Sequence, residues 1–109
     1  MQYITDIKQL NDLKSNTAVL ILFGARQCAV CQSIRPKLTT MLAQQFPQMQ
    51  GVYVDCETSA DICAQHSVFS LPVVSVYIEA MKIAEEVRAF SIKQLAQTIE
   101  RPYEMWKNQ

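Results

Sequence analysis

Apolar residues follow a strand-like pattern in several parts of the chain. The continuous apolar run from Ala18 to Phe23 has the length of a strand, and such runs are typical of central strands buried on both faces. Residues 52–56 and 73–78 predict a second and a third strand. Residues 81–87 could form a fourth strand, although two adjacent glutamates blur its alternation.

Positions spaced like one face of a helix lie between these strands. Asp6 can cap a first helix. A long helix is predicted from about Cys28 to Gln45, and Pro36 inside it should introduce a kink. The expected core-facing residues are Ile7, Leu10 and Leu13 in the first helix and Ile34, Leu38, Met41, Leu42 and Phe46 around the second.

Two more helices are predicted in the second half of the chain. The first is a short one over 59–66. The second begins at Ser91, where Ser91 and Gln94 form a capping box, and Pro102 should end it. Its apolar stripe consists of Ile92, Leu95, Ala96 and Ile99.

The order of these elements predicts an α/β fold. Early alternation of helices and strands favours a parallel strand pair covered by helices on both faces. Two closely spaced strands near 73–87 favour an antiparallel hairpin at one edge. The expected architecture is a three-layer α/β/α sandwich with a central mixed sheet.

Composition narrows the possible functions. The 109 residues suit a single domain over 1–109, in which 105–109 form a short C-terminal extension. The formal net charge is zero, which gives no support to a nucleic-acid partner. The N-terminus does not resemble a signal peptide, and the longest apolar run is too short to cross a bilayer. A cytoplasmic protein without a membrane partner is therefore expected.

The candidate chemistry lies at Cys28 and Cys31. They follow a buried strand and open a helix, whose first turn offers unpaired backbone N–H groups and the positive end of the helix dipole. Cys28 should therefore ionise readily and act as the attacking thiolate. Cys31, one turn further on the same side, can resolve a mixed disulfide on Cys28. Arg26 either favours the thiolate or points into solvent, and both interpretations are open.

The residues around these cysteines carry a family resemblance. The stretch from Val19 to Cys31, followed by Ile34 and Pro36, resembles the thioredoxin active-site region. Residues 68–72 resemble the family loop that ends in a cis-proline, and the hairpin and helix over 73–100 resemble the end of the thioredoxin fold. The match covers roughly residues 4–104.

This resemblance implies a protein disulfide reductase or related exchange protein. The Leu71–Pro72 peptide bond should be cis. An extended substrate peptide would lie beside Ala29, Val30 and Pro72, hydrogen-bonded to the Leu71 backbone, and Arg88 would lie where partners approach. Protein disulfides or dithiols are the implied substrates, with a thioredoxin-reductase-type electron donor. No cofactor or metal is implied.

Several positions depart from the family pattern. Gly24 and Gln27 stand where the family usually has tryptophan, and Ala29-Val30 replaces Gly-Pro. Leu22 replaces a buried aspartate, and Tyr53 replaces its lysine partner. Two late glycines of the pattern are Ala80 and Arg88, where Arg88 either selects acidic partners or, as we favour, is simply solvated. Without the buried carboxylate, we expect slower exchange than in a general thioredoxin.

Other candidate residues have simpler interpretations. Cys56 and Cys63 are expected to be small packed residues, although a second disulfide is possible if their Cα atoms lie within about 7 Å of each other. Their spacing does not match common zinc or iron–sulfur sites. His66 is expected at the surface. Tyr103 and Trp106 would share a face if a helical turn resumed after Pro102.

Two classes of function follow from the sequence. The first is a thiol–disulfide oxidoreductase that uses Cys28 and Cys31. The second is a non-catalytic binding module that holds a partner in the groove beside Pro72. The cysteine pair favours the enzyme, whereas the departures at Leu22, Gly24 and Arg88 favour a narrow role.

Overall fold

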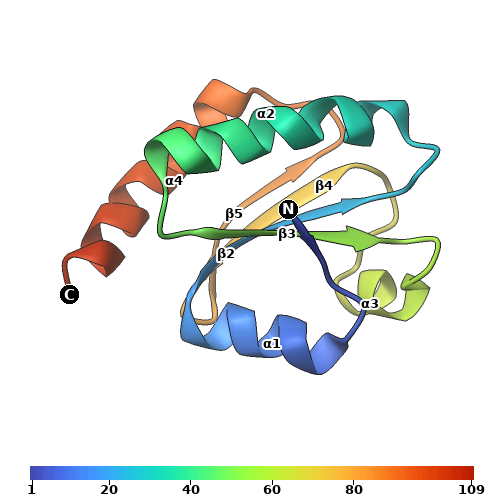
Figure 1. The fold of residues 1–109 in the computed structure, drawn as a ribbon, viewed down its shortest axis with the longest axis horizontal. Coiled ribbons are helices and arrows are strands. Elements are labelled where there is room, and N and C mark those ends of the chain that lie inside the picture. Colours follow the sequence, from blue (N-terminus) through green and yellow to red (C-terminus); the bar gives the residue numbers. More distant parts are fainter.

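A five-stranded mixed sheet forms the middle layer of the protein in the computed structural model, which describes residues 1–109 (Figure 1). Its spatial order is β1-β3-β2-β4-β5. Strands β1, β3 and β2 run parallel, and β4 and β5 are antiparallel to their neighbours. The strands span β1 Gln2–Tyr3, β2 Ala18–Gly24, β3 Gln50–Asp55, β4 Val73–Ile78 and β5 Met81–Val87.

Two helices cover each face of the sheet, which gives the predicted three layers (Figure 1). Helices α1 and α3 pack on one face, and α2 and α4 pack on the other. The helices span α1 Ile7–Asn16, α2 Ala29–Gln45, α3 Ala60–Gln65 and α4 Ile92–Lys107. The predicted α/β architecture is confirmed.

Strand β2 lies in the centre of the sheet because both of its faces are apolar. Leu20 and Leu22 point into the core beneath α2 and α4. Val19, Ile21 and Phe23 point into the second core beneath α1 and α3. Every residue of β2 is buried, which explains why its sequence is continuously apolar rather than alternating.

The predicted helix starts are largely confirmed. The Asp6 carboxylate accepts a hydrogen bond from the Lys8 N–H at 2.9 Å and caps α1. The Ser91 hydroxyl accepts one from the Gln94 N–H at 3.1 Å and caps α4, which is one half of the predicted capping box. Helix α2 runs through Pro36 as expected.

Two features of the chain ends were not predicted correctly. Strand β1, which pairs in parallel with β3, was missed because two exposed residues carry no periodicity. Helix α4 does not end at Pro102 but continues to Lys107. The buried Tyr103 explains this: its ring packs on Phe46 at 5.1 Å between centroids, and its hydroxyl accepts a hydrogen bond from the Gln48 N–H. This packing offsets the cost of proline inside a helix, about 3 kcal/mol.

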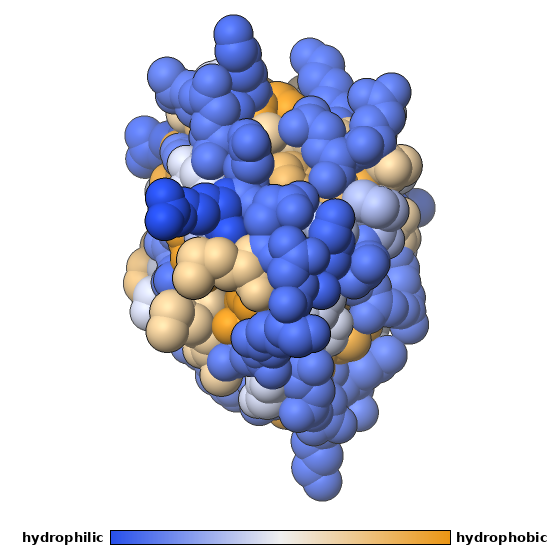
Figure 2. Space-filling model, turned by 90° about the vertical axis from the view of Figure 1, so that its left-hand side faces the viewer, coloured by the Kyte–Doolittle hydropathy of each residue, from blue (hydrophilic) through white to orange (hydrophobic).

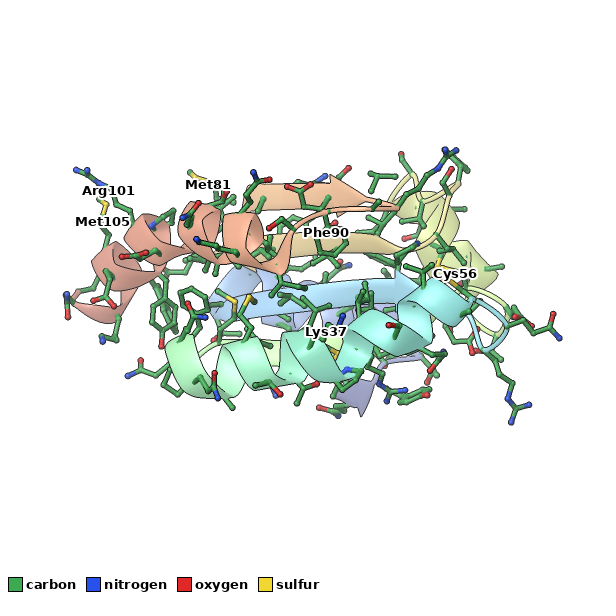
Figure 3. All side chains as sticks on the ribbon, turned by 90° about the horizontal axis from the view of Figure 1, so that it is seen from above. Lys37, Cys56, Met81, Phe90, Arg101 and Met105 are labelled. Atoms are coloured by element: carbon green, nitrogen blue, oxygen red, sulfur yellow. A yellow bond between two sulfur atoms is a disulfide. The ribbon has the colours of Figure 1, made fainter.

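Tyr103 and Trp106 in the last turns of α4 pack back on the fold. Tyr103 and Trp106 share a helix face, with ring centroids 5.9 Å apart. Met81 and Met105 stay exposed beside a shallow pocket of about 790 Å³ at this end of the molecule (Figure 3). Figure 2 views this end and shows hydrophobic atoms gathered within a mainly hydrophilic surface. None of the helices combines the length and apolarity needed to cross a membrane.

Candidate active site

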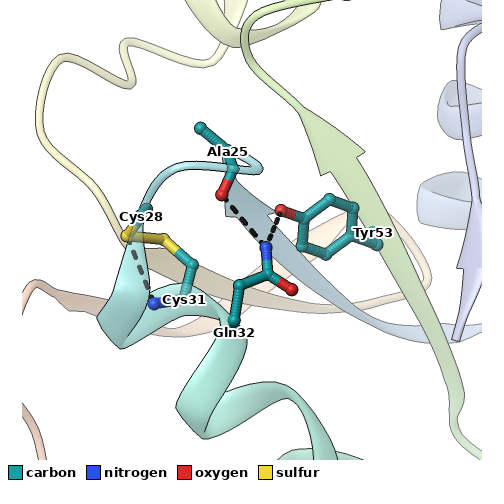
Figure 4. The surroundings of a disulfide bond; sticks show 5 residues. All are labelled: Ala25, Cys28, Cys31, Gln32 and Tyr53. Carbon is teal, nitrogen blue, oxygen red and sulfur yellow. Dashed lines mark hydrogen bonds between the residues drawn. A yellow bond between two sulfur atoms is a disulfide. The ribbon is translucent and has the colours of Figure 1, made fainter.

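Cys28 and Cys31 are joined by a disulfide at the N-terminus of α2, with Cα atoms 5.2 Å apart (Figure 4). Strand β2 ends at Gly24, and a short turn delivers Cys28 to the N-cap position of the helix. Its backbone is extended (φ −85°, ψ 101°), as is usual for an N-cap residue. Cys31 then lies in the first turn, close enough to bond to it.

The environment of Cys28 suits a negative charge on its sulfur. The backbone N–H of Cys31 donates a hydrogen bond to Cys28 Sγ at 3.2 Å. The first turn of α2 contains no acidic residue, so the positive end of the helix dipole is not neutralised there. Cys28 is partly exposed, whereas Cys31 is fully buried. Arg26 is exposed and forms no ion pair.

Gly24 and Tyr53 lie directly behind Cys31. A Cβ atom built on Gly24 would stand 2.7 Å from the Tyr53 hydroxyl and 3.2 Å from Cys31 Sγ. The missing side chain of Gly24 therefore leaves room for both the tyrosine hydroxyl and the buried sulfur close to the same point. The larger aromatic residue that the family usually has at position 24 could not occupy this space together with Tyr53.

The Tyr53 hydroxyl is held by Gln32 on the first turns of α2 (Figure 4). Gln32 Nε2 donates to the Ala25 carbonyl at 3.0 Å and to Tyr53 Oη at 3.4 Å. Burial raises the pKa of the Tyr53 hydroxyl, partly opposed by the Gln32 hydrogen bond. The guanidinium of Arg35 lies 4.7 Å from the centre of the Tyr53 ring.

No carboxylate lies beneath the cysteine pair. Leu22, which stands at the position of the family's buried aspartate, is fully buried in the core beneath α2 and α4. It pairs in register with Tyr53 across β2 and β3. The two departures from the family pattern thus lie side by side and form one apolar contact in place of an ion pair.

Strand register brings the predicted substrate-binding loop to the same end of the sheet. Phe23 of β2 pairs with Val73 of β4, which in turn pairs with Val87 of β5. Pro72 therefore lies opposite the start of the cysteine turn, and the Arg88 N–H donates a hydrogen bond to the Pro72 carbonyl at 2.7 Å. The Leu71–Pro72 peptide bond is cis, as the resemblance implies.

The surface around the cysteine pair is apolar in two places. Val30 is 52% exposed and Phe69 is 84% exposed. Ala29 is also exposed, Leu71 is partly buried and Pro72 is buried. Sequence reasoning did not single out Phe69, although an aromatic residue three positions before the cis-proline was a usable signal.

Arg88 and Ala80 have the backbone conformation that glycine adopts most easily. Their φ angles are 67° and 76°. The Arg88 side chain is exposed, and its Nη2 donates a hydrogen bond to the Ser70 hydroxyl at 3.3 Å. The arginine is therefore solvated, as favoured from the sequence, but it is tethered to the cis-proline loop.

For the second cysteine pair the favoured interpretation was wrong, and the alternative of a second disulfide is what the structure contains. Cys56 and Cys63 are bonded to each other, with Cα atoms 5.7 Å apart, and are not two separate packed thiols. The turn after β3 brings Cys56 back over α3, a contact that sequence spacing alone does not reveal. The Cys56 N–H also donates to the Gly24 carbonyl at 2.8 Å, so this disulfide adjoins the strand end that carries the cysteine turn.

His66 was expected at the surface, but the structure places it in a partly buried position. Its ring is partly buried against Phe23, with centroids 5.3 Å apart. Nδ1 lies 2.9 Å from the Ile62 carbonyl, and Nε2 lies 2.9 Å from Lys14 Nζ. Burial, more than the lysine charge, lowers the pKa of His66. No group of three or more histidine, cysteine or acidic side chains is placed to hold a metal ion.

Comparison with known proteins gives consistent matches. The Thioredoxin family model matches residues 3–101. The chain is 26% identical to the thioredoxin-like protein YdfQ of Bacillus subtilis over 99 residues, which is 91% of this chain and 88% of that protein. It is 30% identical to Thioredoxin-2 of Pyricularia oryzae over 87 residues, 79% of this chain and 50% of that protein.

Solved structures show the same fold. Plasmodium falciparum thioredoxin superimposes with a TM-score of 0.80 at 20% identity, covering 89% of this chain and 97% of that one. An Entamoeba histolytica thioredoxin mutant superimposes with a TM-score of 0.78 at 25% identity, covering 92% of this chain and 97% of that one.

Proposed function

Because the chain belongs to the thioredoxin family, we propose that it is a protein disulfide reductase in which Cys28 attacks and Cys31 resolves. Family membership together with the bonded cysteine pair makes it a thiol–disulfide oxidoreductase. The different exposure of the two cysteines supports this division of roles. Cys28 is partly exposed at the helix N-terminus, and Cys31 is fully buried one turn later.

The proposed reaction begins with the reduced pair. The Cys28 thiolate attacks one sulfur of a substrate disulfide, forms a mixed disulfide and expels the other substrate sulfur as a thiolate, which takes a proton from water. The thiolate of Cys31 then attacks Cys28 Sγ. This step forms the Cys28–Cys31 disulfide and expels the second substrate thiolate. Two electrons have moved from the cysteine pair to the substrate.

A second cycle requires a reductant for the Cys28–Cys31 disulfide. We propose a dithiol donor of the thioredoxin-reductase type, which would attack the more accessible sulfur, Cys28. The donor's dithiol becomes a disulfide, and the cysteine pair regains two electrons. The zero net charge of the chain does not favour a nucleic-acid partner, and we propose a cytoplasmic site of action.

Substrate binding is proposed along the cis-proline loop. An extended peptide beside Pro72 could pair with the Leu71 backbone as an added strand. Ala29, Val30 and Phe69 offer exposed apolar surface on the two sides of such a peptide. The Arg88 guanidinium, tethered to Ser70, would lie at the rim and favour acidic partners.

The same apolar surface favours a second candidate, a binding module that holds a partner without exchanging disulfides. A trapping experiment distinguishes the two. A Cys31→Ser variant is incubated with a disulfide-containing protein such as insulin, and Cys28→Ser serves as the matched control. The reductase predicts a stable mixed disulfide through Cys28 in the first variant and none in the second. Equal non-covalent binding by both variants, with no mixed disulfide, would establish the binding module instead.

A further inference from the structure

The resolving step needs Cys31 to be a thiolate, although its sulfur is buried in the protein. Cys31 is fully buried, and burial in apolar surroundings disfavours the charged form of a thiol. Leu22 beneath the pair is apolar and can neither accept the Cys31 proton nor donate a hydrogen bond. A group that donates to the Cys31 sulfur would lower the cost of the charge.

Tyr53 is the polar side chain best placed for this purpose. Its hydroxyl and Cys31 Sγ both lie close to the point where a Gly24 Cβ would stand, at 2.7 and 3.2 Å from it. Because Gly24 has no side chain, residue 24 places no Cβ at that point. The disulfide fixes the Cys31 side chain toward Cys28, and opening the disulfide frees rotation of this side chain about its Cα–Cβ bond.

The hydroxyl proton of Tyr53 is available for a new acceptor. Tyr53 Oη accepts a hydrogen bond from Gln32 Nε2, and it donates to no protein atom while the disulfide is closed. A phenol can donate and accept at the same time. Gln32 also bonds to the Ala25 carbonyl and so fixes the hydroxyl from the side of α2.

We propose that the Tyr53 hydroxyl donates a hydrogen bond to the Cys31 thiolate once the disulfide opens, and so assists the resolving attack on Cys28. The inference rests on the proposed function, because it assigns a role within the second exchange step. Tyr53 thereby stabilises the Cys31 thiolate at a site where Leu22 leaves no carboxylate to accept the proton.

Tyr53 acts in this scheme as a donor and not as a base. Burial raises the pKa of its hydroxyl, so it stays protonated at neutral pH. The Cys31 proton leaves to solvent instead. An open pocket of about 550 Å³ is lined by Tyr53 and Gln32 together with Asp55 and Glu57, so solvent lies on the Tyr53 side of the site.

Other titratable groups also surround Tyr53. Asp55 extends from β3 and Tyr3 from β1, and both raise its pKa, whereas the Arg35 guanidinium from α2 lowers it. Arg35 Nη1 donates to the Tyr3 hydroxyl at 2.8 Å and lies over both tyrosine rings. Replacement of Tyr53 by phenylalanine keeps the ring under Arg35, so the variant removes the hydroxyl alone.

The test follows the two exchange steps separately. Reduced protein, carrying Cys56→Ser and Cys63→Ser to silence the second pair, is mixed with dithiobis(nitrobenzoic acid). Attack by Cys28 releases one coloured thiolate in a phase that depends on reagent concentration. Attack by Cys31 on the resulting mixed disulfide releases the second coloured thiolate in a phase that does not.

In the Tyr53→Phe variant we expect the first phase to be unchanged. Loss of a hydrogen bond to a charged sulfur should raise the pH of half-maximal rate for the second phase by about one to two units. Because a more basic thiolate is also a better nucleophile, the net slowing at neutral pH should be about three- to ten-fold. At high pH the variant should be at least as fast as its parent.

Tyr103→Phe is the matched control, since it also removes a buried hydroxyl, one that accepts from the Gln48 N–H far from the pair. Fluorotyrosine at position 53 keeps the shape and strengthens the donor, so it should lower the half-maximal pH. An unchanged second phase in both position-53 variants, or equal slowing by Tyr103→Phe, would overturn the inference. A parent protein that lacks the second phase would instead refute the resolving role of Cys31.

Discussion

The Tyr53 hydroxyl lies so close to Gly24 behind the redox pair that a Cβ atom on Gly24 would stand only 2.7 Å from it. The same Cβ atom would lie 3.0 Å from Cys31 Cβ. Gly24 is therefore required by packing, and its backbone conformation is that of an ordinary strand residue at the end of β2. The pair of substitutions, glycine at 24 and tyrosine at 53, acts as a unit.

Gly24→Ala should therefore destabilise the protein and displace the Tyr53 hydroxyl. Insertion of a methyl group into a closely packed site costs about 1–3 kcal/mol, and the buried tyrosine ring has little room to move. Urea unfolding would measure the loss. The double variant Gly24→Ala/Tyr53→Phe should recover part of it, because the clashing oxygen is gone. If the losses in free energy of unfolding of the two single variants simply added in the double variant, a clash between the Gly24 position and the Tyr53 hydroxyl would be contradicted.

Much of this site was predictable from the sequence, and the reasons differ among residues. The positions of Cys28 and Cys31 followed from a buried strand, a turn and a helix start, all of which leave local signals. The contact between Gly24, Tyr53 and Gln32 could not be predicted in this way. These residues lie on β2, β3 and α2, which are brought together only by the strand register and the docking of the helix. Family comparison marked positions 24 and 53 as unusual but could not show that they touch.

Other differences between prediction and structure have a similar origin. Pro102 is a strong local signal for a helix end, and tertiary packing of Tyr103 overrides it. The Cys56–Cys63 bond depends on how the turn after β3 folds back onto α3. By contrast, the β4–β5 hairpin and the helix caps depend on neighbouring residues and were predicted correctly.

The Cys56–Cys63 disulfide should contribute to stability and not to turnover. Closing a loop with a sequence separation of 7 residues stabilises the fold by about 2.5 kcal/mol in the chain-entropy account. The double variant Cys56→Ser/Cys63→Ser should lose about this much in urea unfolding under oxidising conditions. Its rate of insulin reduction should stay within about two-fold of the parent, since Cys28 and Cys31 are untouched. A complete loss of activity would place the second pair in the reaction.

Ala80→Gly should stabilise the β4–β5 hairpin. Glu79 and Ala80 have φ angles of 46° and 76°, the positive values of a tight hairpin turn that favours glycine at its second position. Relief of left-handed strain, about 1–2 kcal/mol, exceeds the entropy cost of glycine, so a net gain of about 0.5–1 kcal/mol is expected in thermal or urea unfolding. Ala84→Gly within β5 is the matched control and should destabilise by about 1 kcal/mol. Equal effects of the two substitutions would contradict this assignment.

Acidification should weaken the fold through His66. Its folded pKa lies below the ordinary 6.5, so the unfolded chain binds more protons as the pH falls through that value. The stability that neutral His66 provides is therefore present above about pH 6.5 and is lost as the pH falls toward the lower folded pKa. Protonation also sets His66 against the Lys14 ammonium, which lies 2.9 Å from Nε2.

Thermal unfolding from roughly pH 7 to pH 5 measures this effect. The melting temperature of the parent should fall over this range, and that of His66→Gln should fall less. Near pH 7 the two melting temperatures should run parallel as the pH changes, because His66 is neutral there. Below that pH the two curves should diverge. Parallel curves across the whole range would show that another group is responsible.

An equilibrium redox titration shows whether Cys28 and Cys31 form a reversible redox couple. The protein is equilibrated in dithiothreitol or glutathione buffers, its thiols are alkylated, and mass spectrometry counts the label on the peptide that contains both cysteines. We expect a single two-electron transition in which Cys28 and Cys31 lose their label together, with or without Cys56 and Cys63 present. A pair that stays fully labelled under every oxidising buffer would contradict it.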